Sequence, residues 1–331
     1  METLKFKTPM PSYKIKHITR YTYKSPVIDC TNQIMLYPII DDRLEVKKHE
    51  IKVSNDPEIE VFTDYFGNKV GAFSVIKPHT ELLIESTAEV FTKPVLVPMD
   101  EMPAAEQWKH LQDIKNEVEF FDFLKDTPFS SYEDVKSTLS PIINLSDKPL
   151  KNALVLSEYV NDNFIYQTGV TNIETPVEEI WNLKAGVCQD FAHMLLVMLR
   201  MFKIPARYVS GYVCPKETGV RGEEATHAWV EAYIPFYGWL GLDPTNNCIV
   251  TDGHVRIAVG RNFADCTSVK GTYKGSGEHT LEVKVNIENG KPRQTPQQTG
   301  RSAFPYIVEK TEAPVNSYRK YLEMQQQQQQ Q

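Results

Sequence analysis

Alternation of hydrophobic and polar positions dominates the first hundred residues of the chain. The clearest stretches, rich in Val, Ile, Phe, Tyr and Thr, are 13–23, 44–62 and 70–90. Turn-forming residues separate them at 55–57 and 66–68. Several short strands divided by such turns are typical of a β-sandwich or a small barrel. We therefore expect a sandwich-like, β-rich N-terminal domain over residues 1–97.

A three- and four-residue spacing of apolar side chains replaces this alternation over residues 99–124. The apolar positions are Trp108, Leu111, Ile114, Val118 and Phe121. Such spacing predicts an amphipathic helix. Pro128 and Pro141 interrupt the segment that follows. We expect residues 98–147 to form a helical connector between two domains.

Helical and then strand-like patterns fill residues 148–290. An apolar stripe in 150–164 predicts one helix, and Thr175-Pro176 predicts the start of a second, short one that ends near 183. Gly186 is suited to a tight turn with positive φ. A third helix is expected to begin near Cys188 and to end near Phe202, because Ile204-Pro205 follows.

The predicted strands of this second half are 206–213, 227–234, 239–243, 255–259 and 281–287. Helices followed by strands predict an α+β domain over residues 148–290. Residues 291–331 are rich in Pro and Gln and end in seven glutamines. Such a composition cannot bury a core, so we expect a tail that is disordered or lies along the surface.

Three residue types that together support thiol chemistry follow one another in this region. Cys188 opens a predicted helix, where free N–H groups and the helix dipole favour a thiolate. His227 begins a predicted strand, and Asp243 ends the next one. An imidazole can carry the thiol proton, and a carboxylate can hold that imidazole in one tautomer. We expect a Cys188–His227–Asp243 triad, with the Cys188 N–H, and as a guess Tyr166, donating to the oxyanion.

The strand predicted at 227–234 has two unlike faces. One is uniformly apolar and suited to a core: Ala228, Val230, Ala232 and Ile234. The other carries His227, Trp229, Glu231 and Tyr233. We expect this second face to border a cleft. The register against 239–243 is not fixed by the sequence, so a bulge or twist is needed to bring His227 and Asp243 together.

Nearby groups suggest other roles. His193 lies five residues after Cys188, about 140° around the helix, so we expect a bonded structural histidine rather than a base. Cys214 is a rival nucleophile, but it ends a strand without support from a helix or turn. A metal site from Cys188, His193, His227 and Asp243 is conceivable, although no pair has zinc-like spacing.

Composition narrows the partners and the setting. A net charge of −7 argues against nucleic-acid binding, which normally needs a basic stripe. No run of about 18 apolar residues is present, and the first residues lack a signal-type apolar segment. The five cysteines are scattered without a Cys-x-x-Cys pair, which predicts neither a zinc ribbon nor a disulfide framework. We expect a soluble, cytoplasmic protein without a cofactor or a membrane partner, acting on a peptide or protein substrate.

Several of these segments resemble the transglutaminase-like superfamily, in particular its bacterial members regarded as candidate cysteine proteases. The matching segments are Gly-Val-Cys-Gln-Asp-Phe-Ala-His at 186–193, the strand at 204–212, His-Ala-Trp-Val-Glu at 227–231, Gly-Trp-Leu-Gly-Leu-Asp-Pro-Thr-Asn at 238–246, and 254–261. Residues 13–23, Tyr37-Pro38 and 64–68 resemble the β domain that often precedes this catalytic domain. The resemblance covers about residues 12–287.

The resemblance implies a papain-like α+β catalytic domain behind a β-sandwich-like domain, and a thioester mechanism. It departs from the family after Gly260-Arg261, where Asn262-Phe263-Ala264 replaces the usual Asp-Tyr, which affects the expected substrate preference. We expect a hydrolase acting on peptide or glutamine-like amide bonds, because no amine-binding site is marked. An amine-transferring transglutaminase, or a non-catalytic binding or assembly protein on the same scaffold, are the alternatives.

Overall fold

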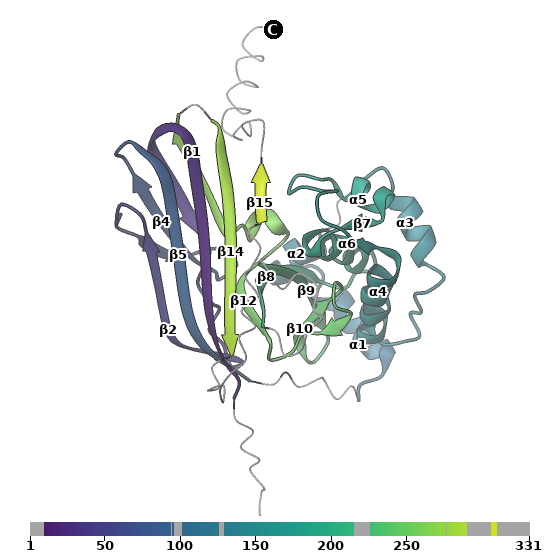
Figure 1. The fold of residues 1–331 in the computed structure, drawn as a ribbon. Coiled ribbons are helices and arrows are strands. Elements are labelled where there is room, and N and C mark those ends of the chain that lie inside the picture. Colours follow the sequence, from purple (N-terminus) through teal and green to yellow (C-terminus); the bar gives the residue numbers. More distant parts are fainter. Residues whose placement is uncertain are drawn as a thin grey trace, which may run out of the picture.

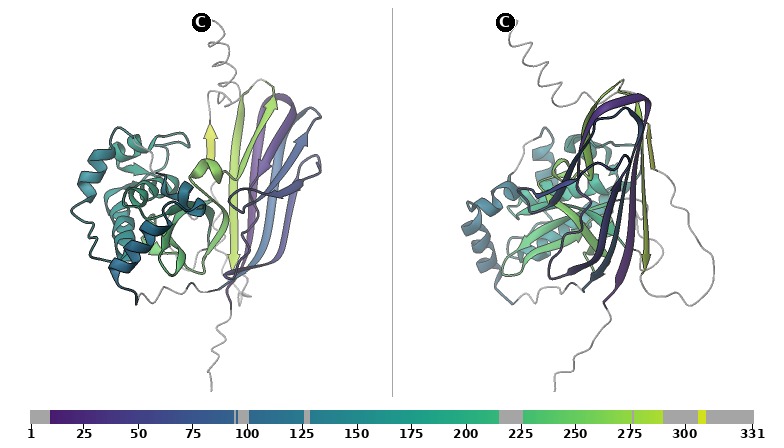
Figure 2. Two further views of the ribbon diagram at one scale, coloured as in Figure 1. Left: turned by 180° about the vertical axis from the view of Figure 1, so that it is seen from behind. Right: turned by 90° about the vertical axis from the view of Figure 1, so that its left-hand side faces the viewer.

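The structure, a computed structural model, places a tall β domain beside a mixed α/β domain (Figure 1). It describes residues 10–93, 95, 101–125, 129–214, 226–275 and 277–289, and the backbone of 306–309. In the described residues no helix is both long enough and apolar enough to cross a membrane. The two domains lie against one another along most of their length, as the views from behind and from the side show (Figure 2).

The β domain is organised around one long strand. Its strands are β1 (Ser12–Ile34), β2 (Leu44–Val53), β3 (Glu60–Thr63), β4 (Lys69–Val75) and β5 (His79–Thr92), joined by β13 (Val269–Lys274), β14 (His279–Asn289) and β15 (Tyr306–Glu309). The first half of β1 pairs with β5 and β14, and its second half pairs with β4 and β13. The expected sandwich-like β domain is confirmed.

This pairing moves one expected domain boundary. The strand expected at 281–287 is present in β14, but it pairs with β1 in the N-terminal sheet and not with the catalytic strands. Residues 269–289 therefore return to the first domain, although they were expected to close the second. Alternation can reveal a strand, but it does not say which sheet the strand joins. Most of the expected tail, 291–331, lies outside the described residues; the backbone of β15 pairs with β14.

Six helices are described in the second domain and the segment before it. They are α1 (Ala104–Ile114), α2 (Val118–Leu124), α3 (Tyr132–Leu139), α4 (Pro149–Asn163), α5 (Val177–Leu183) and α6 (Cys188–Met201). The single helix expected over 99–124 is two, because the chain breaks between Ile114 and Val118. The break changes the buried side: Val118 and Phe121 are exposed, and Phe120 is buried instead.

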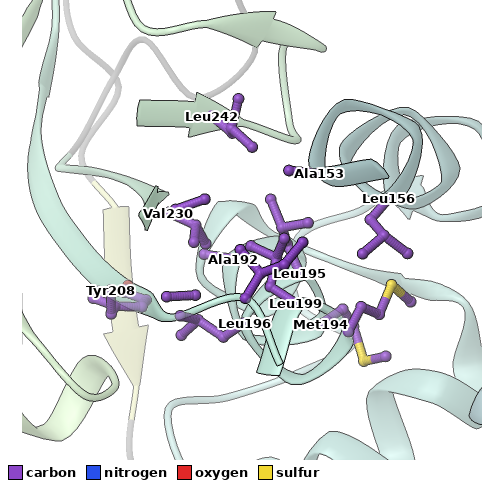
Figure 3. Packing of buried hydrophobic residues seen from close by; sticks show 14 of the residues in the cluster. Ala153, Leu156, Ala192, Met194, Leu195, Leu196, Leu199, Tyr208, Val230 and Leu242 are labelled. Atoms are coloured by element: carbon purple, nitrogen blue, oxygen red, sulfur yellow. The ribbon is translucent and has the colours of Figure 1, made fainter. Parts of the chain in front are cut away.

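A second, antiparallel sheet forms the centre of the α/β domain. It consists of β8 (Ala206–Val213), β9 (His227–Ile234), β10 (Gly238–Asp243), β11 (Cys248–Ile249) and β12 (His254–Gly260), in the order β11-β10-β9-β8-β12. Helix α6 packs on one face of β9, with Leu195 and Ala192 close to Val230 (Figure 3). A short parallel pair, β6 (Ile165–Tyr166) and β7 (Ala185–Gly186), leads into α6.

The other face of this sheet is covered as well. Tyr212, Val255 and Ile257 belong to the hydrophobic cluster of the β domain, and Trp229 packs in a small cluster that includes Ile39 and Phe66 of that domain. The sheet is therefore a middle layer between the helices and the β domain. The N-terminal domain occupies much of the face that carries His227, and a pocket lined by Asp41, Glu231 and Arg256 remains along it.

Candidate active site

Cys188 is the first residue of α6, as expected, and a buried carboxylate holds that helix start in place. Asp190 Oδ2 accepts hydrogen bonds from the Val187 N–H at 2.7 Å and from the Thr171 hydroxyl at 2.6 Å. Burial raises the pKa of Asp190, and these two donors oppose the rise. The Cys188 N–H belongs to the first turn, whose amides have no partner within the helix. An N–H in this position can donate to an oxyanion.

Gly186 is needed at this start for a reason other than the one expected. Its φ is not positive; the left-handed residue nearby is Lys184, with φ 50°. A Cβ on Gly186 would instead overlap the Asp190 side chain, because it would lie only 2.7 Å from the Asp190 Cβ. A side chain at 186 would thus displace Asp190 and the amide that it binds.

The hairpin of β9 and β10 brings His227 and Asp243 together without a bulge. Leu242 pairs with Val230, so Asp243 follows across from Trp229, on the face that also carries His227. The rings of His227 and Trp229 stack with centroids 6.2 Å apart, which confirms the shared face. Diagonal neighbours on one face of an antiparallel pair are within reach of long side chains.

The three expected residues meet at the end of this hairpin. His227 Nε2 lies 2.8 Å from Asp243 Oδ2, and both side chains are fully buried. Because Nε2 is engaged, we assign the interaction of Cys188 with the imidazole to Nδ1, which has no other partner in the described part of the chain. Cys188 is partly exposed.

Charge fixes the protonation of this group. Burial would lower the pKa of His227, but the Asp243 carboxylate and Cys188 raise it to about 10. Burial would likewise raise the pKa of Asp243, whereas the imidazoles of His227 and His254 hold it well below its usual range. At neutral pH the arrangement is therefore a carboxylate beside an imidazolium.

Asp243 has further partners that the sequence did not reveal. Its Oδ1 accepts the N–H groups of Thr245 and Asn246 at 3.0 and 3.2 Å. Its Oδ2 also accepts from Asn246 Nδ2 at 2.7 Å and from His254 Nε2 at 3.2 Å. Asn161 of α4 binds the carbonyls of Pro244 and Thr245 from the opposite side. Asn246 lies close to Asp243 in the sequence, whereas His254 and Asn161 are distant from it.

The alternative groups are placed elsewhere. His193 Nε2 accepts the N–H of Phe263 at 3.2 Å, and burial lowers its pKa to about 4, so it is a bonded, neutral histidine as expected. Phe263 lies in the short 3₁₀ turn Phe263–Asp265, the segment that departs from the family. Cys214 is buried within the cluster of the β domain, away from a helix start.

One group in the described residues has the composition of a metal site. Ligand atoms of Asp243, Cys248 and His254 lie within 4.8 Å of one another. Burial and the Asp243 carboxylate raise the pKa of Cys248 to about 12, so its sulfur is a neutral thiol. Asp243 Oδ2 is already occupied by N–H donors. The chemistry of these donors does not fit a cation, and the set that included His193 is not brought together.

This architecture, a papain-like α+β core behind a β sandwich, is that of a known family. Residues 112–244 match the transglutaminase-like superfamily, and residues 13–91 match the bacterial transglutaminase-like N-terminal region. A protein of Mycobacterium leprae with no assigned function is 31% identical over 277 residues, which cover 83% of this chain and 97% of that protein. The chain belongs to the transglutaminase-like superfamily.

Two further similarities concern the fold and a named activity. A candidate cysteine protease from Cytophaga hutchinsonii has the same fold, with a TM-score of 0.66 at 20% identity, covering 91% of this chain and 98% of that one. A protein-glutamine gamma-glutamyltransferase of Pseudomonas aeruginosa is 31% identical over 104 residues, 28% of this chain and 15% of that protein.

Proposed function

We propose that the protein is a cysteine-dependent acyl-transfer enzyme that acts on peptide or glutamine-like amide bonds. The observation that carries the proposal is the buried pair of His227 Nε2 and Asp243 Oδ2, 2.8 Å apart, with Cys188 acting on the same imidazole. A histidine that is held by a carboxylate and turned toward a thiol at a helix start is the arrangement that nucleophilic thiol catalysis needs.

The reaction follows from these positions. The Cys188 thiolate attacks the carbonyl carbon, a C–S bond forms, and the oxygen becomes an oxyanion next to the Cys188 N–H. The imidazolium of His227 gives its Nδ1 proton to the leaving nitrogen, the C–N bond breaks, and a thioester remains. Neutral His227 then takes a proton from water, whose oxygen attacks the thioester. The C–S bond breaks, the acid is released, and the Cys188 thiolate and the His227 imidazolium are restored.

Hydrolysis is the version that we favour, and transfer to an amine is the second candidate. Transfer differs only in the second nucleophile, a primary amine in place of water. The named activity of the Pseudomonas aeruginosa relative supports considering it. No surface in the described residues marks an amine site. The five free cysteines support placement in a reducing compartment such as the cytoplasm.

Thiol labelling tests whether the site is reactive. At neutral pH, iodoacetamide should modify Cys188 faster than Cys30, Cys214, Cys248 and Cys266, as followed by peptide mass spectrometry. His227→Ala should slow labelling of Cys188 and leave the other four unchanged. Equal rates at all five cysteines would contradict the enzyme and would favour a binding or assembly protein on this scaffold.

A second assay separates water from amine as acceptor. The protein is incubated with a glutamine-containing peptide, with and without a labelled primary amine. Hydrolysis predicts ammonia release with a one-dalton mass increase of the peptide and no label. Incorporation of the labelled amine at a rate similar to that of ammonia release would show that the protein is a transferase and not a hydrolase. Cys188→Ala is the control that should abolish either product.

A further inference from the structure

His254 lies against the proposed catalytic acid, Asp243. It is the first residue of β12, and only 5% of its side chain is exposed. Its ring stands edge-on to Trp229, with centroids 5.2 Å apart, and its Nε2 lies 3.2 Å from Asp243 Oδ2. The same carboxylate oxygen is therefore contacted by two imidazoles, those of His227 and His254.

The other nitrogen of His254 determines where its proton is. The backbone N–H of Thr251 donates to His254 Nδ1 at 3.2 Å. A nitrogen that accepts an N–H cannot carry a proton itself, so the neutral ring carries its proton on Nε2. That N–H can only be the donor in the contact with Asp243. His254 is thus fixed by the backbone as a donor to the carboxylate, which also explains why it is a poor metal ligand.

We propose that His254 is a positioning residue, which orients Asp243 and keeps it ionised while His227 changes its protonation state. This inference rests on the proposed function. During the proposed cycle His227 gives its proton away, and the buried carboxylate then faces a neutral ring. Hydrogen bonds to a carboxylate favour its charged form. Donation from His254 persists through that step, because its proton takes no part in the transfer.

Two substitutions separate the hydrogen bond from the ring. His254→Phe keeps a ring against Trp229 and removes the donor, whereas His254→Gln keeps an N–H at a similar reach. The rate of Cys188 alkylation by iodoacetamide should fall about tenfold in His254→Phe, the size expected for one hydrogen bond to a charged group. It should stay within about threefold of the wild type in His254→Gln. A merely structural role predicts no such rescue.

The protein offers a matched control. His17 is also buried and bonded at both nitrogens, to Tyr212 Oη at 2.9 Å and to Thr19 Oγ1 at 3.1 Å, but it belongs to the β domain. His17→Phe should leave the Cys188 alkylation rate unchanged. Equal slowing in His254→Phe and His254→Gln, or no slowing in either, would overturn the proposal. Where His254→Phe does not fold, His254→Met removes the donor at similar length.

A measurement on the wild type needs no substitution. The ¹⁵N chemical shifts of the His254 ring report its tautomer, and we expect the neutral ring to carry its proton on Nε2 and not on Nδ1. Protonation at Nδ1 would refute the inference on its own. If Cys188 of the wild type is no more reactive than the other cysteines, the proposed function fails. A tautomer with Nε2 protonated would in that case still describe the hydrogen bond, but the catalytic role of His254 would fall with the function.

Discussion

The two faces of β9 are built for different purposes. Toward the helices it presents Ala228, Val230 and Ala232, all within the large apolar cluster around α6. Toward the β domain it presents His227 and Glu231, with Trp229 between them. Both faces are buried, so burial alone does not separate them. The helix side supplies stability through packing, and the other side combines polar chemistry with domain contacts.

The polar face is possible because its charges are paired. Glu231 is 1% exposed and receives Arg207 at 2.6 and 2.7 Å and Arg256 at 2.9 Å. Arg256 also binds Asp41, which belongs to the N-terminal domain. Burial would raise the pKa of Glu231, but the two arginines lower it. The network therefore connects the two domains through the strand that carries His227.

The N-terminal domain also completes the edge of the catalytic sheet. The Asn68 side-chain amide donates from Nδ2 to the Val259 carbonyl in β12 and accepts the Val259 N–H at Oδ1, each at 2.8 Å. The Ile39 N–H donates to the Arg256 carbonyl at 2.9 Å. An unpaired strand edge is thus covered by the first domain. The β domain is therefore a structural part of the layer that holds the candidate active site.

The largest expected effect lies at the acid of the polar face. Asp243→Asn places an amide N–H where His227, His254 and Asn246 already donate, so donors face donors. His227 then has no charged partner to hold it in one tautomer. We expect about a 10⁴-fold loss of ammonia release from a glutamine peptide, as for the same change in a serine protease triad. Asp29→Asn, at an exposed pair with Lys274, should leave the rate unchanged. A loss below tenfold would remove Asp243 from the proposed triad.

The next effect concerns the charges that connect the domains. Glu231→Gln leaves Arg207 and Arg256 buried without their common partner, so the free energy of unfolding should fall by about 3–5 kcal/mol. Urea denaturation measures this change. The control is Glu89→Gln, whose partner Lys47 is 57% exposed and whose pair should contribute about 0–1 kcal/mol. Similar losses in the two variants would mean that the buried network contributes no more than a surface pair.

On the apolar face we expect a change in stability without a change in chemistry. Val230→Ala removes two buried carbon atoms against α6 and should cost about 2 kcal/mol of unfolding free energy. Cys188 alkylation in the folded protein should remain at the wild-type rate. If Val230→Ala strongly slowed Cys188 alkylation while the free energy of unfolding stayed unchanged, the apolar face of β9 would contribute to the chemistry and not only to stability.

The smallest effect distinguishes two buried histidines. Burial lowers the pKa of His17 to about 4, and His17 bonds Tyr212 of β8 across the domain boundary. Its folded pKa lies below the unfolded value near 6.5, so its contribution to stability is lost as pH falls from 6.5 toward 4. At pH 5.5 the loss should be about 1 kcal/mol. His227, with a raised pKa, predicts the opposite trend as pH rises toward 10.

Urea denaturation at several pH values checks the behaviour of His17. Below pH 6.5 the slope of the wild-type unfolding free energy against pH includes contributions from His17 and from His193, whose pKa is also lowered to about 4. His17→Gln should reduce the slope by about one proton. An unchanged slope would mean that His17 is already accessible to protons in the folded protein.

The sequence supported many of the local features for simple reasons. The start of α6 at Cys188 and the strand 227–234 followed from short-range spacing, and the end of α6 followed from Ile204-Pro205; all three are present. Local patterns also separated His193 from the site. They did not detect the break between α1 and α2, because the apolar spacing continues across residues 115–117. The requirement for glycine at position 186 was predicted from a positive φ, but its physical reason is the close approach of Asp190.

By itself the sequence determined the elements, the two unlike faces of β9 and the three residue types of the candidate triad. These depend on side-chain spacing and on neighbours along the chain. Only the tertiary structure decided the register that joins His227 to Asp243, the return of β14 to the first sheet, and the donors His254 and Asn161. Those contacts join residues far apart in sequence, and their geometry depends on how whole layers pack.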